Sequence, residues 1–337
     1  LGHARELFRR SLVKRGGGEE VVAEKMALLT GTTGYDRFAD VDLVVEAVVE
    51  KMAVKQAVLQ ESEGHLSGGA IFATNTSALS VSELQGVAQR PGKVGGLHFF
   101  NPVAKMQLIE IVHGTGTDPE LVQRGAAFAR RVDRLPLPVK SSPGFLVNRI
   151  LMPYLLEAME LLSEGVPAPA IDHAATSFGM PMGPVELADR VGLDICLAVA
   201  EKLSPFFNLK VPEKLETMVQ QKNLGAKTGS GFYNYTSGKA VYKGTEDPDS
   251  IPQDLADRLI FRLLNESVAC LREQIVEDAD LLDAGVIFGT GFAPFRGGPM
   301  NHIYDRGVEQ QRQRLQQLEQ LHGEQFSPDS GWADLEA

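Results

Sequence analysis

Residues 41–49 read Val-Asp-Leu-Val-Val-Glu-Ala-Val-Val, a nearly continuous run of β-branched and other apolar residues. Such a run predicts a parallel β-strand that is covered on both faces. Other strand patterns lie at residues 70–74, 93–99, 106–113 and 135–139. Amphipathic helical patterns separate several of them, at residues 51–63 and 118–131. Strands that alternate with helices predict a doubly wound α/β sheet.

The segments around this sheet are predicted to be mostly helical. Upstream, residues 1–13 and 19–26 carry helical spacing on either side of a loop at Gly16-Gly17-Gly18, and residues 27–30 predict a short strand. Ser80 and Glu83 form a Ser-x-x-Glu box, which predicts a helix start. Beyond residue 143 strand patterns give way to long helices, beginning at 145–163.

The helical half contains an internal repeat. Asn148-Arg149-Ile150 with Glu157 and Glu164 matches Asp257-Arg258-Leu259 with Glu266 and Glu273. A single helical layer cannot bury its own apolar face, so we expect the two copies to pack as pseudo-equivalent halves. The predicted domains are residues 1–142, 143–245 and 246–337. From residue 309 on, the composition predicts a solvated helix and then a loose end.

Charge and cysteine content exclude several classes of function. The 337 residues include 33 basic and 44 acidic side chains, a net charge of −11, which argues against nucleic-acid or membrane-surface partners. Cys196 and Cys270 give no disulfide framework, so we expect a reducing, cytoplasmic compartment. No apolar run reaches membrane-spanning length, and no signal peptide is visible.

His98 follows a predicted strand in Leu97-His98-Phe99-Phe100-Asn101-Pro102, and Glu110 lies in the next apolar run. An imidazole can accept a hydroxyl proton at neutral pH, and a carboxylate behind it fixes the tautomer and stabilises the imidazolium. The alternative is a structural histidine with an unrelated glutamate nearby. The carboxyl ends of parallel strands are where such sheets bind ligands, and residues 46–50, 75–77 and 98–101 all lie there on this interpretation.

Four motifs resemble those of the 3-hydroxyacyl-CoA dehydrogenase family. They are Ala73-Thr74-Asn75-Thr76-Ser77, residues 97–102 with Glu110, Ser142-Pro143-Gly144-Phe145-Leu146-Val147-Asn148-Arg149, and Lys227-Thr228-Gly229-Ser230-Gly231-Phe232-Tyr233. The last motif and the extended C-terminal half resemble the long form, as in the multifunctional fatty-acid oxidation α subunit. The resemblance implies oxidation of (S)-3-hydroxyacyl-CoA to 3-oxoacyl-CoA with NAD. It also implies a thiolase subunit as a partner, and we expect a homo-oligomer.

Individual roles also come from this resemblance. His98 would be the base and Glu110 its partner. Ser77 and Asn148 match substrate-contacting positions, and Glu50, Lys55, Ser77 and Asn101 match positions around the cofactor. No metal is implied. The alternatives are a helix cap for Ser77, a buried helix-to-sheet hydrogen bond for Asn148, and an exposed ion pair for Glu50 and Lys55. Lys227 is interpreted either as a contact to CoA phosphate or as a solvated side chain.

One departure limits the resemblance. A nicotinamide-binding sheet uses Gly-x-Gly-x-x-Gly between its first strand and helix, with an acidic residue about 20 positions later. Neither is present, and Gly16-Gly17-Gly18 follows a helix. We therefore expect a Rossmann-type domain that lacks its first β-α-β unit, in a fragment that binds NAD poorly or not at all. The rival functions are another β-hydroxyacid dehydrogenase and a non-catalytic assembly fragment that contacts a thiolase.

Overall fold

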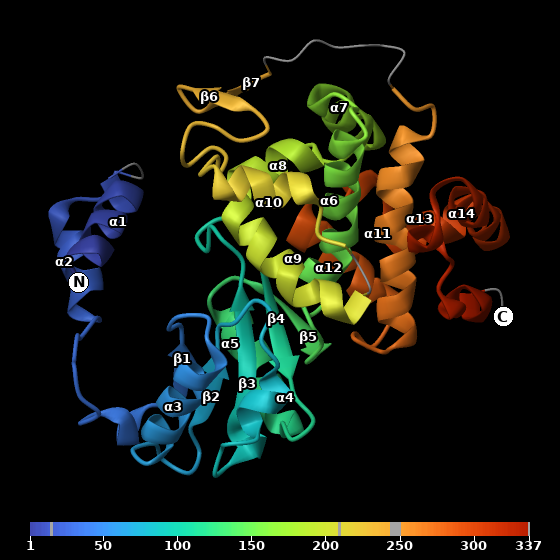
Figure 1. Cartoon of the computed structure of the whole chain (residues 1–337). Helices are drawn as coiled ribbons and strands as arrows, with labels where there is room; N and C mark the ends of the chain where they lie inside the picture. The colour runs from blue at the N-terminus through green and yellow to red at the C-terminus, as the bar shows by residue number, and fades with distance from the viewer. Residues whose placement is uncertain (14–15, 208–209, 243–250, 336–337) are drawn as a thin grey trace.

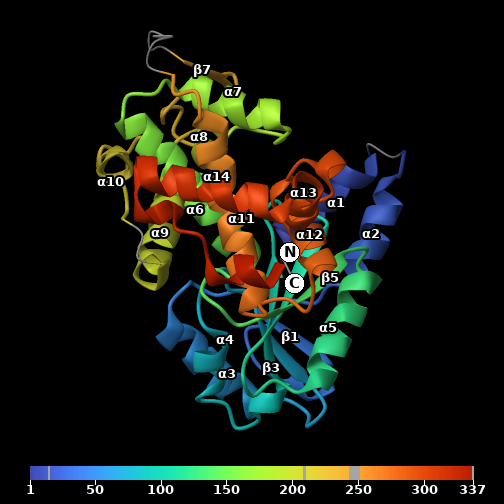
Figure 2. The same ribbon diagram turned by 90° about the vertical axis from the view of Figure 1, so that its right-hand side faces the viewer.

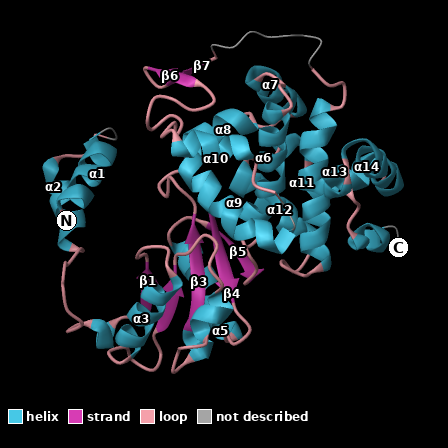
Figure 3. Ribbon diagram, viewed as in Figure 1, coloured by secondary structure: helices cyan, strands magenta, loops and turns pink. Residues whose placement is uncertain are grey.

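A computed structural model describes residues 1–13, 16–207, 210–242 and 251–335. A mixed sheet with its helices forms the lower part of Figure 1, and a larger group of helices lies above it; Figure 3 separates strands from helices by colour. Helices α1 (Gly2–Val13) and α2 (Glu19–Ala27) pack on each other and lie apart from the sheet (Figure 1). No described helix is long and apolar enough to span a membrane.

The sheet has five strands in sequence order. They are β1 (Leu43–Glu46), β2 (Ile71–Thr74), β3 (Val94–Phe99), β4 (Leu108–His113) and β5 (Leu135–Lys140). Helices α3 (Met52–Glu63), α4 (Val81–Gln85) and α5 (Pro119–Arg131) make the connections between parallel neighbours. The Ser80 hydroxyl accepts the Glu83 N–H at the start of α4, which confirms the predicted cap.

Two expectations about the sheet were wrong in detail. Residues 27–30 form no strand, because α2 extends to Ala27 and the next residue, Leu28, is 78% exposed with no strand beside it. β1 is shorter than predicted, lies at the edge, and leaves Val45 40% exposed, so it is not covered on both faces. The doubly wound α/β sheet itself is confirmed, with one antiparallel pair, β3 and β4, on which the sequence made no prediction. Apolar runs indicate strands but do not give their direction.

The helical part begins with α6, which runs through its core. Its first repeat contains α6 (Val147–Ser163), α7 (Ala168–Phe178), α8 (Pro184–Val191), α9 (Leu193–Phe207) and α10 (Glu213–Gln220), then the hairpin β6 (Asn234–Thr236) and β7 (Lys239–Val241). The following elements are α11 (Leu255–Arg272), α12 (Ala279–Thr290), α13 (Pro299–Arg306) and α14 (Val308–His322). The expected boundary at 245/246 lies outside the described residues.

Helices α6 and α11 pack together through reciprocal ion pairs, as the repeated sequence predicts. Each arginine is paired with two glutamates of the other helix or its C-terminal end. The pairs are Arg149 with Glu266 and Glu273, at 2.6 Å each, and Arg258 with Glu157 and Glu164, at 2.7 and 2.6 Å. Both arginines are buried, so each repeat supplies the charges that neutralise the other.

A second feature occurs once in each repeat and fixes the starts of two shorter helices. The Asp172 carboxylate accepts the N–H groups of Val185 and Glu186 at the start of α8, and Asp283 does the same for Met300 and Asn301 in α13. Burial raises the pKa of each carboxyl to about 6, although the hydrogen bonds act to lower it.

The C-terminal segment is not the loose end that its composition predicted. After α14, Phe326 is fully buried and Trp332, in a 3-10 turn (Ser330–Leu335), is 1% exposed. The Trp332 indole N–H donates to Asn265 Oδ1 of α11 at 2.8 Å. Figure 2 shows this segment returning across α11. Two aromatic side chains thus anchor a stretch whose polar composition predicted disorder.

Candidate active site

His98 and Glu110 lie directly opposite each other on the antiparallel strands β3 and β4. Side chains of opposed residues point to the same face of a sheet, and His98 Nδ1 lies 2.6 Å from Glu110 Oε2. His98 is 4% exposed and Glu110 is fully buried. With Nδ1 engaged by the carboxylate, Nε2 is the ring nitrogen left to accept a proton.

The second carboxylate oxygen of Glu110 is bound by the start of α6. Oε1 accepts the N–H groups of Leu146 and Val147, each at 3.0 Å. These N–H groups have no partners within the helix, and the helix dipole favours a negative charge beside them. Glu110 is therefore held as an acceptor by the helical part of the chain while it faces His98 in the sheet.

A tight turn brings those two N–H groups to Glu110. Gly144 and Phe145 both have left-handed backbone angles, with φ of 75° and 53°. A large side chain in this region is strained, at a cost of order 1–3 kcal/mol. The Phe145 ring packs edge-on against the His98 imidazole at 5.6 Å between centroids, and the Phe100 ring lies 4.5 Å from it. The two rings restrict the imidazole to one position.

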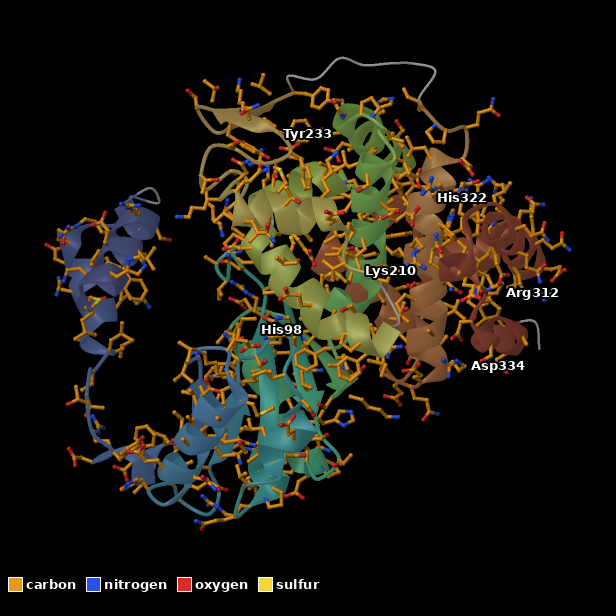
Figure 4. All side chains as sticks on the ribbon, in the orientation of Figure 1. His98, Lys210, Tyr233, Arg312, His322 and Asp334 are labelled. Atoms are coloured by element: carbon orange, nitrogen blue, oxygen red, sulfur yellow. The ribbon has the colours of Figure 1, made fainter. Side chains whose placement is uncertain are left out.

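The structure brings Ser77 and Asn148 together beside this pair. Ser77 follows β2 and is exposed, and Asn148 lies in the first turn of α6. Asn148 Nδ2 donates to the Ser77 carbonyl at 3.2 Å. Ser77 is not the cap of α4, because Ser80 is. The alternative proposed for Asn148, a buried helix-to-sheet hydrogen bond, does not describe this contact, which is exposed and reaches a loop residue after β2. Figure 4 shows His98 at the upper end of the sheet, below α9.

Glu50 lies at the same edge. Its Oε1 accepts the Thr76 hydroxyl at 2.5 Å and the Ser77 N–H at 3.1 Å. Burial acts to raise the pKa of Glu50, but these hydrogen bonds and the charges of Lys55 and Lys202 outweigh it and lower the pKa. The ionised carboxylate is 34% exposed and suits acceptance of hydrogen bonds from hydroxyl groups.

Lys55 is not the exposed ion-pair partner that the sequence left open. It is 1% exposed and its ammonium lies 3.0 Å from Glu46 Oε1 and 3.4 Å from Glu50 Oε2. Glu46 is also bound by the Thr74 hydroxyl and the Val48 N–H. Lys55 of α3 thus holds two carboxylates in place. Asn101 lies exposed just after β3, joined to Pro102 by a cis peptide bond.

The residues present fit one half of a dinucleotide. Glu50, beside Ser77, offers an ionised acceptor for ribose hydroxyls at the carboxyl edge of β1 and β2. In the described part of the chain, however, only α1, α2 and a 3-10 turn precede β1. The unit that holds a pyrophosphate, a strand joined to a helix by a glycine-rich loop, is therefore absent from these described residues.

Comparison with known proteins identifies the family. Residues 2–142 match the model described as 3-hydroxyacyl-CoA dehydrogenase, NAD binding domain, and residues 144–235 match the C-terminal domain of the same family. The structure of (S)-3-hydroxybutyryl-CoA dehydrogenase from Ralstonia eutropha is 35% identical, with a TM-score of 0.65, and the match covers 69% of this chain and 84% of that one. This chain belongs to the 3-hydroxyacyl-CoA dehydrogenase family.

Longer relatives carry the same region. The fatty acid oxidation complex subunit alpha of Shewanella amazonensis is 36% identical over 347 residues, which are 97% of this chain and 48% of that protein. The chain therefore spans about half the length of the curated relatives it matches. The fold of 3-hydroxybutyryl-CoA dehydrogenase from Escherichia coli is similar over 99% of this chain and 89% of that chain, with a TM-score of 0.89 at 23% identity.

The fourth family motif, residues 227–233, has a structural explanation. Asp189 of α8 accepts the N–H groups of Phe232 and Tyr233 at 3.0 and 2.8 Å. A Cβ on Gly231 would lie 2.0 Å from Asp189 Oδ1, so only glycine fits there. Lys227, which the sequence left as a solvated side chain or a phosphate ligand, pairs with Asp194. The motif closes a loop over α8.

Sequence reasoning assigned no individual role to three groups at this edge of the sheet. Glu46 and Thr76 each orient a residue that it did identify, and Lys202 of α9 contributes positive charge to Glu50 from the helical part. Glu46 lies within the predicted strand 41–49 and Thr76 follows the predicted strand 70–74, and that position was the available signal. Lys202 had none, because its approach depends on how α9 packs.

Proposed function

We propose that this chain oxidises (S)-3-hydroxyacyl-CoA to 3-oxoacyl-CoA, with NAD as hydride acceptor and His98 as base. The single observation that supports it most is the buried His98–Glu110 hydrogen bond of 2.6 Å at the carboxyl end of β3. His98 Nε2 takes the proton of the 3-hydroxyl group. Glu110 keeps the proton on Nδ1 and stabilises the imidazolium that forms.

The other site residues bind and orient in this proposal. The Ser77 hydroxyl and the Asn148 amide hold the substrate oxygen, because neither group competes for the proton. Glu50 and Asn101 border the ribose and nicotinamide of NAD, with Ser77 beside them. NAD, when bound, accepts the hydride from the substrate carbon. Lys55 is buried, so its contribution to the cofactor site is to fix the position of Glu50.

The test is reduction of acetoacetyl-CoA by NADH with the chain and its His98→Gln variant, followed by NADH absorbance. We expect turnover with a high KM for NADH, because the described chain has no glycine loop for the pyrophosphate. The kcat of the variant should fall by about 10²–10⁴. His113→Gln is the matched control, since His113 lies at the far end of β4 and should be dispensable. No turnover at any NADH concentration, or equal loss in both variants, contradicts the proposal.

A second candidate is an assembly role, favoured by the name of the longer relatives, which are subunits of a complex. In that proposal a thiolase subunit binds this chain, and copies of the chain associate in the cytoplasm. Size-exclusion chromatography of the chain with and without a thiolase subunit tests it. Co-elution by a chain that lacks turnover favours assembly, and turnover without co-elution favours the dehydrogenase.

A further inference from the structure

A cavity of about 440 Å³ lies in the second helical repeat, away from His98. It is bounded by the end of α7, the start of α11, and α13 with α14; these last two helices lie on the outer side of α11 in Figure 1. Its lining includes three arginines, Arg296, Arg306 and Arg314, together with His302. Basic groups are thus concentrated in one cavity of a chain with a net charge of −11.

Arg296 is held in a fixed plane. Its guanidinium carbon lies 4.0 Å from the centroid of the Phe178 ring, and its Nε donates to the Phe178 carbonyl at 2.9 Å. Within the described part of the chain, its two terminal nitrogens have no hydrogen-bond partner. Stacking keeps the guanidinium ordered while those N–H groups remain available to a ligand.

The cavity has little negative charge to balance its arginines. Among the described lining residues the one carboxylate is Asp257, which already binds Arg314 at 2.7 Å. Arg306 is exposed and has no side-chain partner among the described residues. Burial and the charges of Arg296 and Arg306 lower the pKa of His302 to about 4, while Asp305 opposes them. His302 is therefore neutral at pH 7, and the uncompensated charge is that of the arginines.

The larger cavity of the chain has the opposite character. It measures about 890 Å³ and is lined by five glutamates, namely Glu157, Glu160, Glu266, Glu319 and Glu324, with Lys210 and Arg262. An anion would be repelled there. Of these two cavities, the one beside Arg296 is therefore the one whose lining favours an anion.

We propose that the cavity beside Arg296 binds a small molecule through a phosphate group, with Arg296 and Arg306 as the phosphate ligands. The planar guanidinium donates pairs of parallel N–H groups, which match phosphate oxygens. A volume of about 440 Å³ lies within the usual range of small-molecule sites, roughly 300–1,000 Å³. The site shares no residue with the His98–Glu110 edge, so its ligand would bind independently of the dehydrogenase reaction.

Inorganic pyrophosphate is the probe, titrated into the full chain in a calorimeter at neutral pH. We expect saturable binding. Side-chain NMR should also show that the pKa of His302 rises above about 4, since the anion offsets the charges of Arg296 and Arg306. The groups that face His302 are those two arginines, Asp305 and the Phe178 ring, 5.3 Å away. If the arginines had only a structural role, pyrophosphate would leave the pKa of His302 unchanged.

Variants separate this site from non-specific attraction. Arg306→Gln should weaken pyrophosphate binding about tenfold or more, because a hydrogen bond to a charged group is lost. Arg296→Lys keeps the charge but loses the planar pair of donors, so it should also weaken pyrophosphate binding. The control is Arg190→Gln, which removes the same charge from α8, where Arg190 pairs with Glu186. Absence of saturable binding, equal weakening by Arg190→Gln, or equal binding of inorganic sulfate would overturn the proposal. None of these readouts depends on turnover.

Discussion

The Glu110→Gln substitution tests the central pair most directly. In the structure, Oε1 of Glu110 accepts two N–H groups from α6 and Oε2 binds His98 Nδ1. Glutamine has nearly the same shape but one oxygen. That oxygen can keep the two backbone N–H groups, which places the amide NH₂ against His98 Nδ1. Because an amide nitrogen only donates, Nδ1 must then accept, and the imidazole proton moves to Nε2.

The expected loss follows from this change of tautomer. With Nε2 protonated, this nitrogen has no lone pair for the substrate proton of the proposed reaction, and the Nδ1 lone pair is occupied by the amide of residue 110. General-base catalysis contributes roughly 10²–10⁴ in rate, equal to about 2.7–5.4 kcal/mol in the activation free energy. The free energy of unfolding should change less, by about 1–3 kcal/mol, because only the contact with His98 is replaced.

Two assays check the prediction. Steady-state kinetics with acetoacetyl-CoA should show the loss in kcat with little change in KM for the substrate. Nitrogen-15 NMR should show Nδ1 protonated in the native chain and Nε2 protonated in the variant, and this readout needs no cofactor. A variant with kcat within about threefold of the native value, or with Nδ1 still protonated, would refute the reasoning.

Three further predictions concern stability. Arg258→Ala should lower the free energy of unfolding by about 3–5 kcal/mol in a urea titration, because Glu157 stays buried without its partner. Gly231→Ala should destabilise the loop over Asp189, seen as a lower Tm, since a Cβ would lie 2.0 Å from its carboxylate. The pH dependence follows from Asp172, whose native pKa is about 6 against an ordinary value of 3.8. Between pH 3.8 and about 6 the folded state binds more protons at Asp172 than the unfolded state does. The stability that Asp172 contributes is therefore fully present below about pH 4 and is lost as the pH rises through 6.

Each has a control. Arg190→Ala removes an exposed arginine and should cost under about 1 kcal/mol. Gly68→Ala, where nothing lies within 4 Å of the added Cβ, should leave Tm nearly unchanged. Asp172→Asn should flatten the stability profile between pH 4 and 6. Profiles of equal slope in both proteins would show that Asp172 titrates normally.

The sequence predicted the strands and the site edge because their patterns are local. The β-branched run at 41–49 and the capping box at Ser80 depend on neighbouring residues alone. The run forms the shorter strand Leu43–Glu46, and the Ser80 cap is confirmed. His98 and Glu110 were predicted as a pair, and their contact needs only that two adjacent strands align.

What the sequence could not show depends on partners distant in the chain. For Lys55 the sequence left a position beside the cofactor or an exposed ion pair; its burial depends on Glu46 on the preceding strand. Trp332 was placed in a loose end because its neighbours are polar, and only the position of Asn265 shows where it packs. The direction of β4 depends on the turn before it, which apolar spacing does not record.

The crossed arginine contacts of α6 and α11 have a consequence for how such chains arise. Arg149 lies in the first repeat, next to Asn148. Both glutamates that neutralise its charge belong to the second repeat. A polypeptide with one copy of the repeat would need a second chain to neutralise this arginine. In a symmetric dimer the same contact forms twice, once from each chain to the other. When both copies lie in one chain, the second copy can differ from the first without losing these contacts. Aspartate stands at position 257, where the first copy has Asn148.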